Sequence, residues 1–274
     1  MEHAPQADHI RLLFDPQVAV ATCAGQRRRF ASVVEGLSTE ELAWPSRCED
    51  WTVGDVLRHL LWVDLTVRRI WSGDESIADG FDPRITPNKA VRKDRSVPDD
   101  EVRERYLLSS KAMVADLESS DSERFGQPSL SPAGHVPWWM SAVHIGWDSS
   151  IHERDALLPL GLRVEQLNNE TDLYLAYSLV LTSFFAGRDP IAVRIGPAEL
   201  RRDNGPVIVR MVSSAEVEDE SRFESPTVVT TEDPVKAIDA ISGRGDAGDA
   251  LRGEATFVHR LGGLSRFFSA GPLG

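Results

Sequence analysis

The sequence contains only two cysteines, Cys23 and Cys48, among 274 residues, and this scarcity excludes a framework of disulfide bonds. It also lacks any run of about 18 consecutive apolar residues, the length that a membrane-spanning helix requires. Its first residues, MEHAPQADHIRLL, have neither the basic start nor the apolar run of a secretory signal. We therefore expect a cytoplasmic protein without a membrane partner.

The sequence has fewer basic than acidic residues. The chain has 30 lysines and arginines against 43 acidic residues, which gives a formal net charge of −13. Such a chain repels the phosphates of nucleic acids, and no basic stripe offsets the repulsion. We therefore expect no nucleic-acid partner. Hydrophobic residues make up 41% of the sequence, which is ordinary for a globular protein with a sizeable core.

Tryptophan does not occur after residue 147. All seven tryptophans lie between Trp44 and Trp147, and this shift in composition indicates two structural units that join near residues 160 to 170. We predict one domain over residues 10–165 and a second over residues 166–274.

The first predicted domain carries the signals of four long helices. Asp15-Pro16 opens a helix that continues to about Leu37. Capping boxes begin at Ser38 and Thr52, the second with Asp in place of Glu. Further helices are expected after Thr52, from Asp99, and from Pro137 to about residue 158. Residues 73–98, rich in proline, glycine and charge, are predicted to form a loop that is long enough to be a lid or a binding loop. Four such helices predict a bundle.

The second predicted domain mixes helical and strand patterns, which indicates an α+β fold. Helices are expected at residues 171–186, 234–241 and 263–268, and β-branched runs predict strands at 191–195, 206–212, 227–231 and 255–259.

Three polar residues recur at four-residue steps in the fourth predicted helix. His144, Asp148 and His152 form a row along one helix face, each about 6 Å above the last. The neighbouring row, Val143, Trp147 and Ile151, is apolar, so we expect the polar row to face the interior. Buried carboxylates and imidazoles are costly unless they are paired or bound to a metal.

His59, in the helix after Thr52, is a candidate third metal ligand. It lies at the edge of an apolar stripe, and taken alone it reads as a core histidine hydrogen-bonded to the backbone. Together with Asp148 and His152 it would complete three ligands and leave an open coordination position, as in catalytic zinc sites. The spacing alone leaves a metal centre and a hydrogen-bonded polar network as equal alternatives.

Two motifs carry a family resemblance. WPSRCEDWTVGDVLRHL (44–60) and WDSSIHERDALLPLG (147–161) resemble the signatures of the DinB-like family that includes mycothiol-dependent maleylpyruvate isomerase. The resemblance implies a four-helix bundle that holds a divalent metal, usually zinc, through His59, Asp148 and His152. The family normally has glutamate at the position of Asp148, which is one methylene shorter. His144 lies outside the signature, and we interpret it as a residue that supports the ligands, with direct ligation of the metal as the lesser alternative.

Residues 235–268 resemble the sterol-carrier-like α+β domain that is attached to many of these enzymes. The resemblance implies that an arginine of this domain reaches toward the site, and Arg244 matches that arginine as a candidate catalytic residue. A solvated loop arginine is the alternative interpretation.

The resemblance implies a metal-dependent enzyme that uses mycothiol as its thiol cosubstrate, either an S-transferase or an isomerase. A metal-bound thiol is deprotonated near neutral pH, and the thiolate attacks a small electrophile. The sequence does not identify the electrophile. Two alternatives remain open: a non-catalytic regulator that binds metal or ligand, and a metal-dependent hydrolase that uses bound water.

Two further patterns are given structural interpretations. Cys48 is expected to be a small buried thiol in apolar surroundings with no base beside it. The stretch from Gly243 to Gly248 matches a dinucleotide-binding pattern, but a helix rather than a strand precedes it, so we discard that reading.

Overall fold

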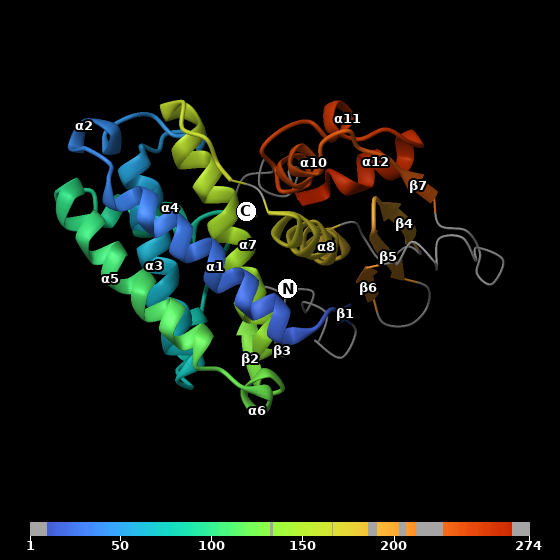
Figure 1. The fold of residues 1–274 in the computed structure, drawn as a ribbon, viewed down its shortest axis with the longest axis horizontal. Helices are drawn as coiled ribbons and strands as arrows, with labels where there is room; N and C mark the ends of the chain where they lie inside the picture. Colours follow the sequence, from blue (N-terminus) through green and yellow to red (C-terminus); the bar gives the residue numbers. More distant parts are fainter. Residues whose placement is uncertain are drawn as a thin grey trace. The chain divides into compact units, whose positions relative to one another are not determined.

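The computed structural model describes residues 10–131, 134–165, 167–185, 191–202, 207–211 and 227–264. The chain divides into two compact units. One, the helical unit, comprises Pro16–Pro132 and Pro137–Gln166; the other, the mixed unit, comprises Met1–Asp15, Ala133–Val136 and Leu167–Gly274. Figure 1 shows long helices in the first and a sheet with helices in the second. Within the described residues, no helix is both long and apolar enough to cross a membrane.

Four long helices build the helical unit. They are α1 (Pro16–Glu35), α3 (Val53–Trp71), α5 (Asp99–Glu118) and α7 (Trp138–Leu157), and they confirm the four helices expected from the sequence. Both α1 and α3 pack against α5 and against α7. Their apolar faces meet in a core that includes Phe30, Leu57, Leu60, Tyr106 and Leu157. Burial of these faces against one another, more than helix propensity, stabilises such helices.

Both predicted capping boxes are present. The Ser38 hydroxyl accepts from the backbone N–H of Glu41, whose carboxylate accepts from the N–H of Ser38 at 2.8 Å. This box opens the short helix α2 (Thr39–Leu42). Thr52 and Asp55 exchange the same pair of bonds at the start of α3. The second box fixes where α3 begins, and hence the turn on which His59 lies.

The prediction of a continuous loop over residues 73–98 is wrong. This segment contains the 3₁₀ helix η2 (Glu75–Ala78) and the α-helix α4 (Thr86–Lys93). Pro87 lies in the first turn of α4, where proline favours a helix instead of interrupting one. Contacts with α3 also support α4, whose Val91 is buried. The short helix α6 (Ser122–Phe125) and a two-stranded sheet of β2 (Pro128–Ser131) and β3 (Gly134–Pro137) precede α7.

A five-stranded sheet forms the centre of the mixed unit. Its strand order is β1-β6-β5-β4-β7, with β1 at Ile10–Leu13, β4 at Ile191–Ile195, β5 at Ala198–Arg202, β6 at Val207–Met211 and β7 at Thr227–Val229. β4, β5 and β6 pair antiparallel, whereas β1 joins β6, and β7 joins β4, in parallel. The strands expected near residues 191, 206 and 227 are confirmed. β1 and β5 did not stand out in the sequence because both are short and interrupted by charge.

Helices complete the mixed unit. α8 (Asn168–Phe185) packs on β5 and β6 and against α10 (Pro234–Ile241), and α11 (Ala247–Ala250) follows. The strand expected at residues 255–259 is wrong, since these residues begin the helix α12 (Ala255–Leu261). The period of such a short apolar run is ambiguous, and Leu261, which is fully buried, anchors the helix. The helix expected at 263–268 falls mostly outside the described residues.

Candidate metal centre

The polar row of the fourth predicted helix lies on α7. Almost every residue of α7 is buried, His152 among them, and the side chain of Asp148 is 20% exposed. The ring of His144 stacks on that of Trp147 at 5.8 Å between centroids. The row therefore lies in the largely buried part of the helical unit, as its apolar neighbours indicated.

His59 meets this row from α3. Its Nε2 lies 3.5 Å from Oδ2 of Asp148, and Nε2 of His152 lies 3.7 Å from Oδ1 of the same carboxylate. Ligand atoms of the three residues all fall within 4.8 Å of one another. The packing of α3 against α7 thus brings together the three residues that the sequence singled out.

The geometry suits a divalent cation. Around tetrahedral zinc, bonds of about 2.0–2.2 Å separate nitrogen and oxygen ligands by roughly 3.3–3.5 Å, close to the distances between Asp148 and the two imidazoles. Nε2 of His59 approaches the buried Oδ2 of Asp148 to 3.5 Å, but among the residues that the structure describes no hydrogen bond of good geometry satisfies that oxygen. A carboxylate oxygen in this position has unused capacity for a cation. Two imidazoles and one carboxylate are also a ligand set typical of catalytic zinc.

Charge coupling in the cluster shifts its pKa values. Burial by itself raises the pKa of Asp148, but the imidazoles of His152, His59 and His144 outweigh burial and hold that pKa well below its usual value. Burial lowers the pKa of His152, yet Asp148, Asp155 and Cys48 together raise it to about 10. For His144, burial dominates and lowers the pKa. Without a metal, the centre therefore pairs an ionised Asp148 with a protonated His152.

The other edge of the His152 ring faces a carboxylate and a thiol. Nδ1 of His152 lies 3.1 Å from Oδ2 of Asp155, a fully buried side chain. Sγ of Cys48 lies 3.2 Å from the same oxygen and 3.8 Å from Nδ1 of His152. Cys48 does pack against the apolar core, as expected, but the expectation that no base lies beside its thiol is wrong. Asp155 follows His152 by three residues on α7, and that helical spacing was the signal for its contact with the ring.

Aromatic rings line the candidate centre. The ring centroid of Trp51 lies 5.3 Å from that of His59 and 6.1 Å from that of His152. Trp62 lies 6.1 Å from His59 and stacks on Phe81 at 6.3 Å. These rings limit the access of water to the imidazoles and lower the local polarity, which strengthens electrostatic interactions at the centre.

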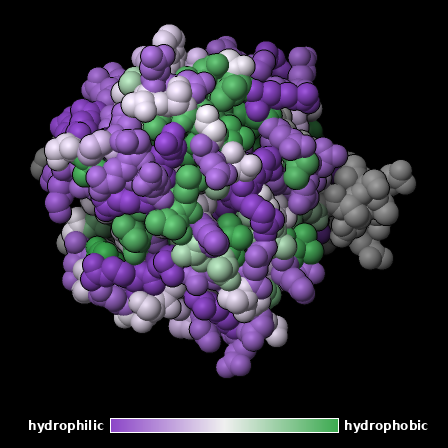
Figure 2. All heavy atoms as spheres, turned by 60° about the vertical axis from the view of Figure 1, so that its left-hand side comes forward, coloured by the Kyte–Doolittle hydropathy of each residue, from purple (hydrophilic) through white to green (hydrophobic). Residues whose placement is uncertain are grey.

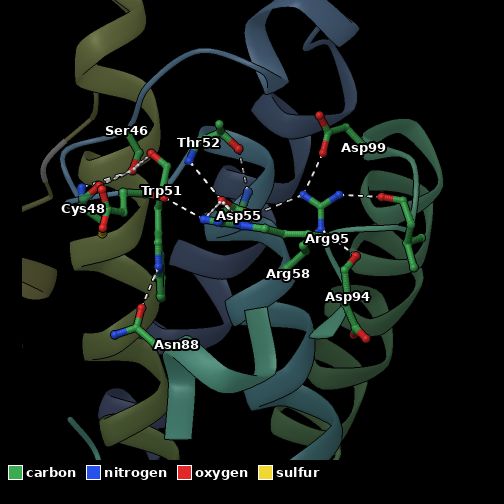
Figure 3. A network of polar contacts seen from close by, with 12 residues as sticks. Ser46, Cys48, Trp51, Thr52, Asp55, Arg58, Asn88, Asp94, Arg95 and Asp99 are labelled. Atoms are coloured by element: carbon green, nitrogen blue, oxygen red, sulfur yellow. Dashed lines mark hydrogen bonds and ion pairs between the residues drawn. The ribbon is translucent and has the colours of Figure 1, made fainter. Parts of the chain in front are cut away.

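Trp51 belongs to a turn that hydrogen bonds hold closed, as Figure 3 shows. The hydroxyl of Ser46 accepts from the N–H of Cys48 at 3.1 Å and donates to the carbonyl of Trp51 at 2.9 Å. The indole N–H of Trp51 donates to Asn88 on α4 at 2.9 Å. α4, within the segment that was expected to be a lid, therefore contacts a ring that lines the centre.

Two arginines, Arg58 and Arg95, fix the C-terminal end of the segment of residues 73–98 by hydrogen bonds. The guanidinium of Arg95 donates to Asp55 at 2.7 Å and to the carbonyl of Asp50. Arg58 donates to Asp99 and to the carbonyl of Asp94. The beginning of α3, which carries His59, is thereby linked to both ends of the connection that leads into α5.

Arg244 lies in the turn after α10 in the mixed unit. Its backbone N–H donates to the carbonyl of Asp239 at 2.7 Å, and its side chain is partly buried. The preceding Gly243 has φ +89, a left-handed conformation that favours glycine at this turn. The role of Arg244 toward the centre stays a prediction.

Comparison with known proteins gives a family match for the part of the chain that contains these residues. Residues 23–156, which include His59, Asp148 and His152, match the family described as mycothiol maleylpyruvate isomerase N-terminal domain. The crystal structures of the mycothiol-dependent maleylpyruvate isomerase and of a histidine-to-alanine mutant of it each match with a TM-score of 0.59 at 12% identity, covering 89% of this chain and 94% of theirs. The likeness to these structures shows a shared fold. A search of curated proteins gives no match. Residues 23–156 of this chain are therefore similar to the mycothiol maleylpyruvate isomerase N-terminal domains.

Proposed function

We propose that this chain is a divalent-metal-dependent enzyme that uses mycothiol, either as an isomerase or as an S-transferase. The observation that carries the proposal is the convergence of His59, Asp148 and His152, whose ligand atoms lie within 4.8 Å of one another. The family that residues 23–156 match and the solved structures of the same fold bear the name of a mycothiol-dependent isomerase, which supports an enzyme and a thiol cosubstrate.

The proposal includes the finer architecture that the sequence resemblance implies. Residues 10–165 would be a DinB-like four-helix bundle, which is supported by the packing of α1 and α3 against both α5 and α7. Residues 166–274 would be a sterol-carrier-like domain, which is supported by a sheet with α8 and α10 packed beside it.

His59, Asp148 and His152 would hold the cation, with zinc the first metal to test because imidazole and carboxylate ligands suit it. Asp148 is one methylene shorter than the glutamate of the family pattern. The approach of His59 to Asp148, at 3.5 Å, supports a shared role of the two side chains as ligands. Three protein ligands leave one position open for a ligand from solution.

When bound, the cation stabilises a thiolate over a thiol at neutral pH, which supplies the nucleophile. The chain prepares the centre for it. Asp155 accepts from Nδ1 of His152 and so keeps the ring turned with Nε2 toward Asp148. Trp51 and Trp62 shield the imidazoles from water.

The thiolate sulfur would form a carbon–sulfur bond to an electron-poor double bond of the substrate, whose π bond breaks as its electron pair moves onto the conjugated carbonyl. If rotation about the resulting single bond is followed by expulsion of the thiolate, the double bond re-forms, the product is an isomer and the thiol is regenerated. If the adduct instead takes a proton from solvent and keeps the carbon–sulfur bond, or expels another leaving group, the reaction is an S-transfer. Arg244 would bind a carboxylate of the substrate, because its planar guanidinium matches two carboxylate oxygens.

The test compares the wild type with His59→Ala and His152→Ala, and uses His259→Ala as a control because His259 is an exposed histidine of α12. We expect about one zinc per chain in the wild type and the control by elemental analysis, and little in the other two variants. With maleylpyruvate as the probe, the wild type should form isomer only when mycothiol is added.

Three results would overturn the proposal. Equal zinc content in all four proteins would remove its metal centre. Turnover that requires zinc but no thiol would identify a hydrolase that uses bound water, and zinc binding without turnover of any electrophile would identify a regulator.

A further inference from the structure

His152 offers a different set of neighbours at each ring nitrogen. Nε2 faces Asp148 and His59, which form the proposed metal position. Nδ1 faces Asp155 and Cys48, and the ligand atoms of Cys48, His152 and Asp155 also lie within 4.8 Å of one another. The proposed function uses neither the thiol of Cys48 nor this second cluster as a ligand set.

The second cluster has dimensions suited to a cation. Its three ligand atoms are separated by 3.1 Å (nitrogen to oxygen), 3.2 Å (sulfur to oxygen) and 3.8 Å (sulfur to nitrogen). Bonds of about 2.0–2.3 Å at tetrahedral angles give separations of roughly 3.4–3.6 Å between such atoms. Shifts of a few tenths of an ångström, outward for the nitrogen–oxygen and sulfur–oxygen pairs, would therefore seat an ion of the size of zinc among the three groups, and a larger ion such as Cd²⁺ needs somewhat wider separations.

The side chains of this cluster are already held in place. Asp155 is fully buried on α7, and the turn that carries Cys48 is fixed to α7 by a hydrogen bond of 3.0 Å from the N–H of Arg47 to the carbonyl of Asp155. Ser46 holds the N–H of Cys48 within the same turn (Figure 3). Such fixed ligands lose little conformational freedom when an ion binds.

We propose that Cys48, His152 and Asp155 form a second cation position, which takes a thiophilic divalent ion such as Cd²⁺ in competition with the position at His59. The choice of ion follows from the ligands. A thiolate is a soft ligand that selects soft cations, whereas the position at His59 offers only nitrogen and oxygen. The guanidinium of Arg47, with its Nε 3.5 Å from Oδ1 of Asp155, leaves Oδ2 to the cation.

The two positions exclude each other because they share one imidazole. A neutral imidazole has a single lone pair on nitrogen for a metal. Binding of Cd²⁺ at Nδ1 forms a sulfur–cadmium and a nitrogen–cadmium bond and releases the thiol proton of Cys48 and the Nδ1 proton of His152 to solvent. His152 then keeps its Nε2 proton, donates it to Asp148, and no longer serves the first position. Binding of Cd²⁺ by the sulfur of Cys48 does not depend on the proposed function. The competition between the two cation positions does rest on it, because it requires a metal at the position of His59.

The experiment titrates the metal-free full-length protein with Cd²⁺ and follows the thiolate-to-cadmium absorption band in the ultraviolet and the ¹¹³Cd chemical shift. The wild type should develop both signatures of sulfur ligation with one Cd²⁺ per chain. Cys48→Ser keeps a hydroxyl near Asp155 and should lose both signatures, with Cd²⁺ affinity reduced at least about tenfold. Cys23→Ala, which removes the buried thiol of α1, should behave like the wild type.

His59→Ala separates this proposal from the proposed function. That variant lacks a ligand of the first position, so it should keep the sulfur signatures, even if no zinc-dependent activity is ever found. In zinc-loaded wild type, one equivalent of Cd²⁺ should release zinc, and Cys48→Ser should require at least about ten times more. A wild type that binds Cd²⁺ without sulfur signatures, or signatures that persist in Cys48→Ser or vanish in His59→Ala, would overturn the second position.

Discussion

His59 on α3 and Asp148 on α7 approach to 3.5 Å between Nε2 and Oδ2, although they belong to different helices and lie far apart in the chain. The same carboxylate presents its other oxygen to His152 at 3.7 Å. One negative charge is thus shared between two imidazoles in a largely buried setting. A substitution of Asp148 therefore alters the electrostatic environment of both histidines at once.

Asp148→Asn should abolish stable metal binding. The amide has nearly the shape of the carboxylate but carries no charge and is a poor metal ligand. We expect zinc affinity to fall at least about 100-fold, on the scale at which even outer partners contribute 10–100-fold. Asp148→Glu, which restores the residue of the family pattern, should retain about one zinc per chain. Competition with a chromophoric chelator measures both affinities, and an undiminished affinity in Asp148→Asn would contradict the role of Asp148.

Zinc binding should release protons near neutral pH. In the metal-free protein, burial lowers the pKa of His152. The neighbouring Asp148, Asp155 and Cys48 outweigh burial and raise this pKa to about 10. The ring therefore carries a proton at pH 7 that must leave before Nε2 can bind the ion. Because protons compete with zinc below this pKa, affinity should rise with pH from 6 to 9. Calorimetry in buffers of different ionisation enthalpy counts the protons, and a count of zero at pH 7 would contradict the protonated ring.

Removal of one partner of the buried pair Arg27–Asp64 should strongly destabilise the helical unit. The guanidinium donates to one oxygen of Asp64 at 2.9 Å and lies 2.6 Å from the other, and neither side chain is exposed. Arg27→Leu leaves a buried carboxylate without its countercharge, at a cost of about 3–5 kcal/mol in the free energy of unfolding. Urea denaturation measures the loss. The exposed pair Arg28–Glu118, which joins α1 to α5, provides the control, since Glu118→Gln should change stability by less than about 1 kcal/mol.

Asn88→Ala should loosen α4 without removing the ring that covers the imidazoles. The substitution eliminates the hydrogen bond of 2.9 Å from the indole of Trp51, which is worth about 0.5–1.5 kcal/mol. Hydrogen exchange should therefore accelerate in residues 86–93, while zinc content stays unchanged. Lys89→Ala, a change at the neighbouring residue of the same helix, is the control and should leave exchange as in the wild type. Equal exchange in both variants would show that packing of α4 on α3 alone holds the segment.

Local interactions explain why part of this structure was predictable. The capping boxes at Ser38 and Thr52 join residues only three positions apart, and the row of His144, Asp148 and His152 follows from the helical repeat. The prediction of a strand at residues 255–259 was wrong because this apolar run is too short to distinguish the two-residue period of a strand from the 3.6-residue period of a helix. The prediction of a loop over α4 was wrong because Pro87 lies in the first turn of this helix. Proline favours a helix at that position and a loop at others, so composition alone does not distinguish the two.

The sequence by itself determined the long helices, the positions at which they begin, and the row of polar residues on one face of α7, because these depend on hydrogen bonds and spacings within a few residues. Only the tertiary structure decided that His59 would complete that row and that Cys48 would reach the edge of the His152 ring at which Asp155 lies. Those contacts join segments whose approach is set by how apolar helix faces pack, and packing of this kind has no local signature in the chain.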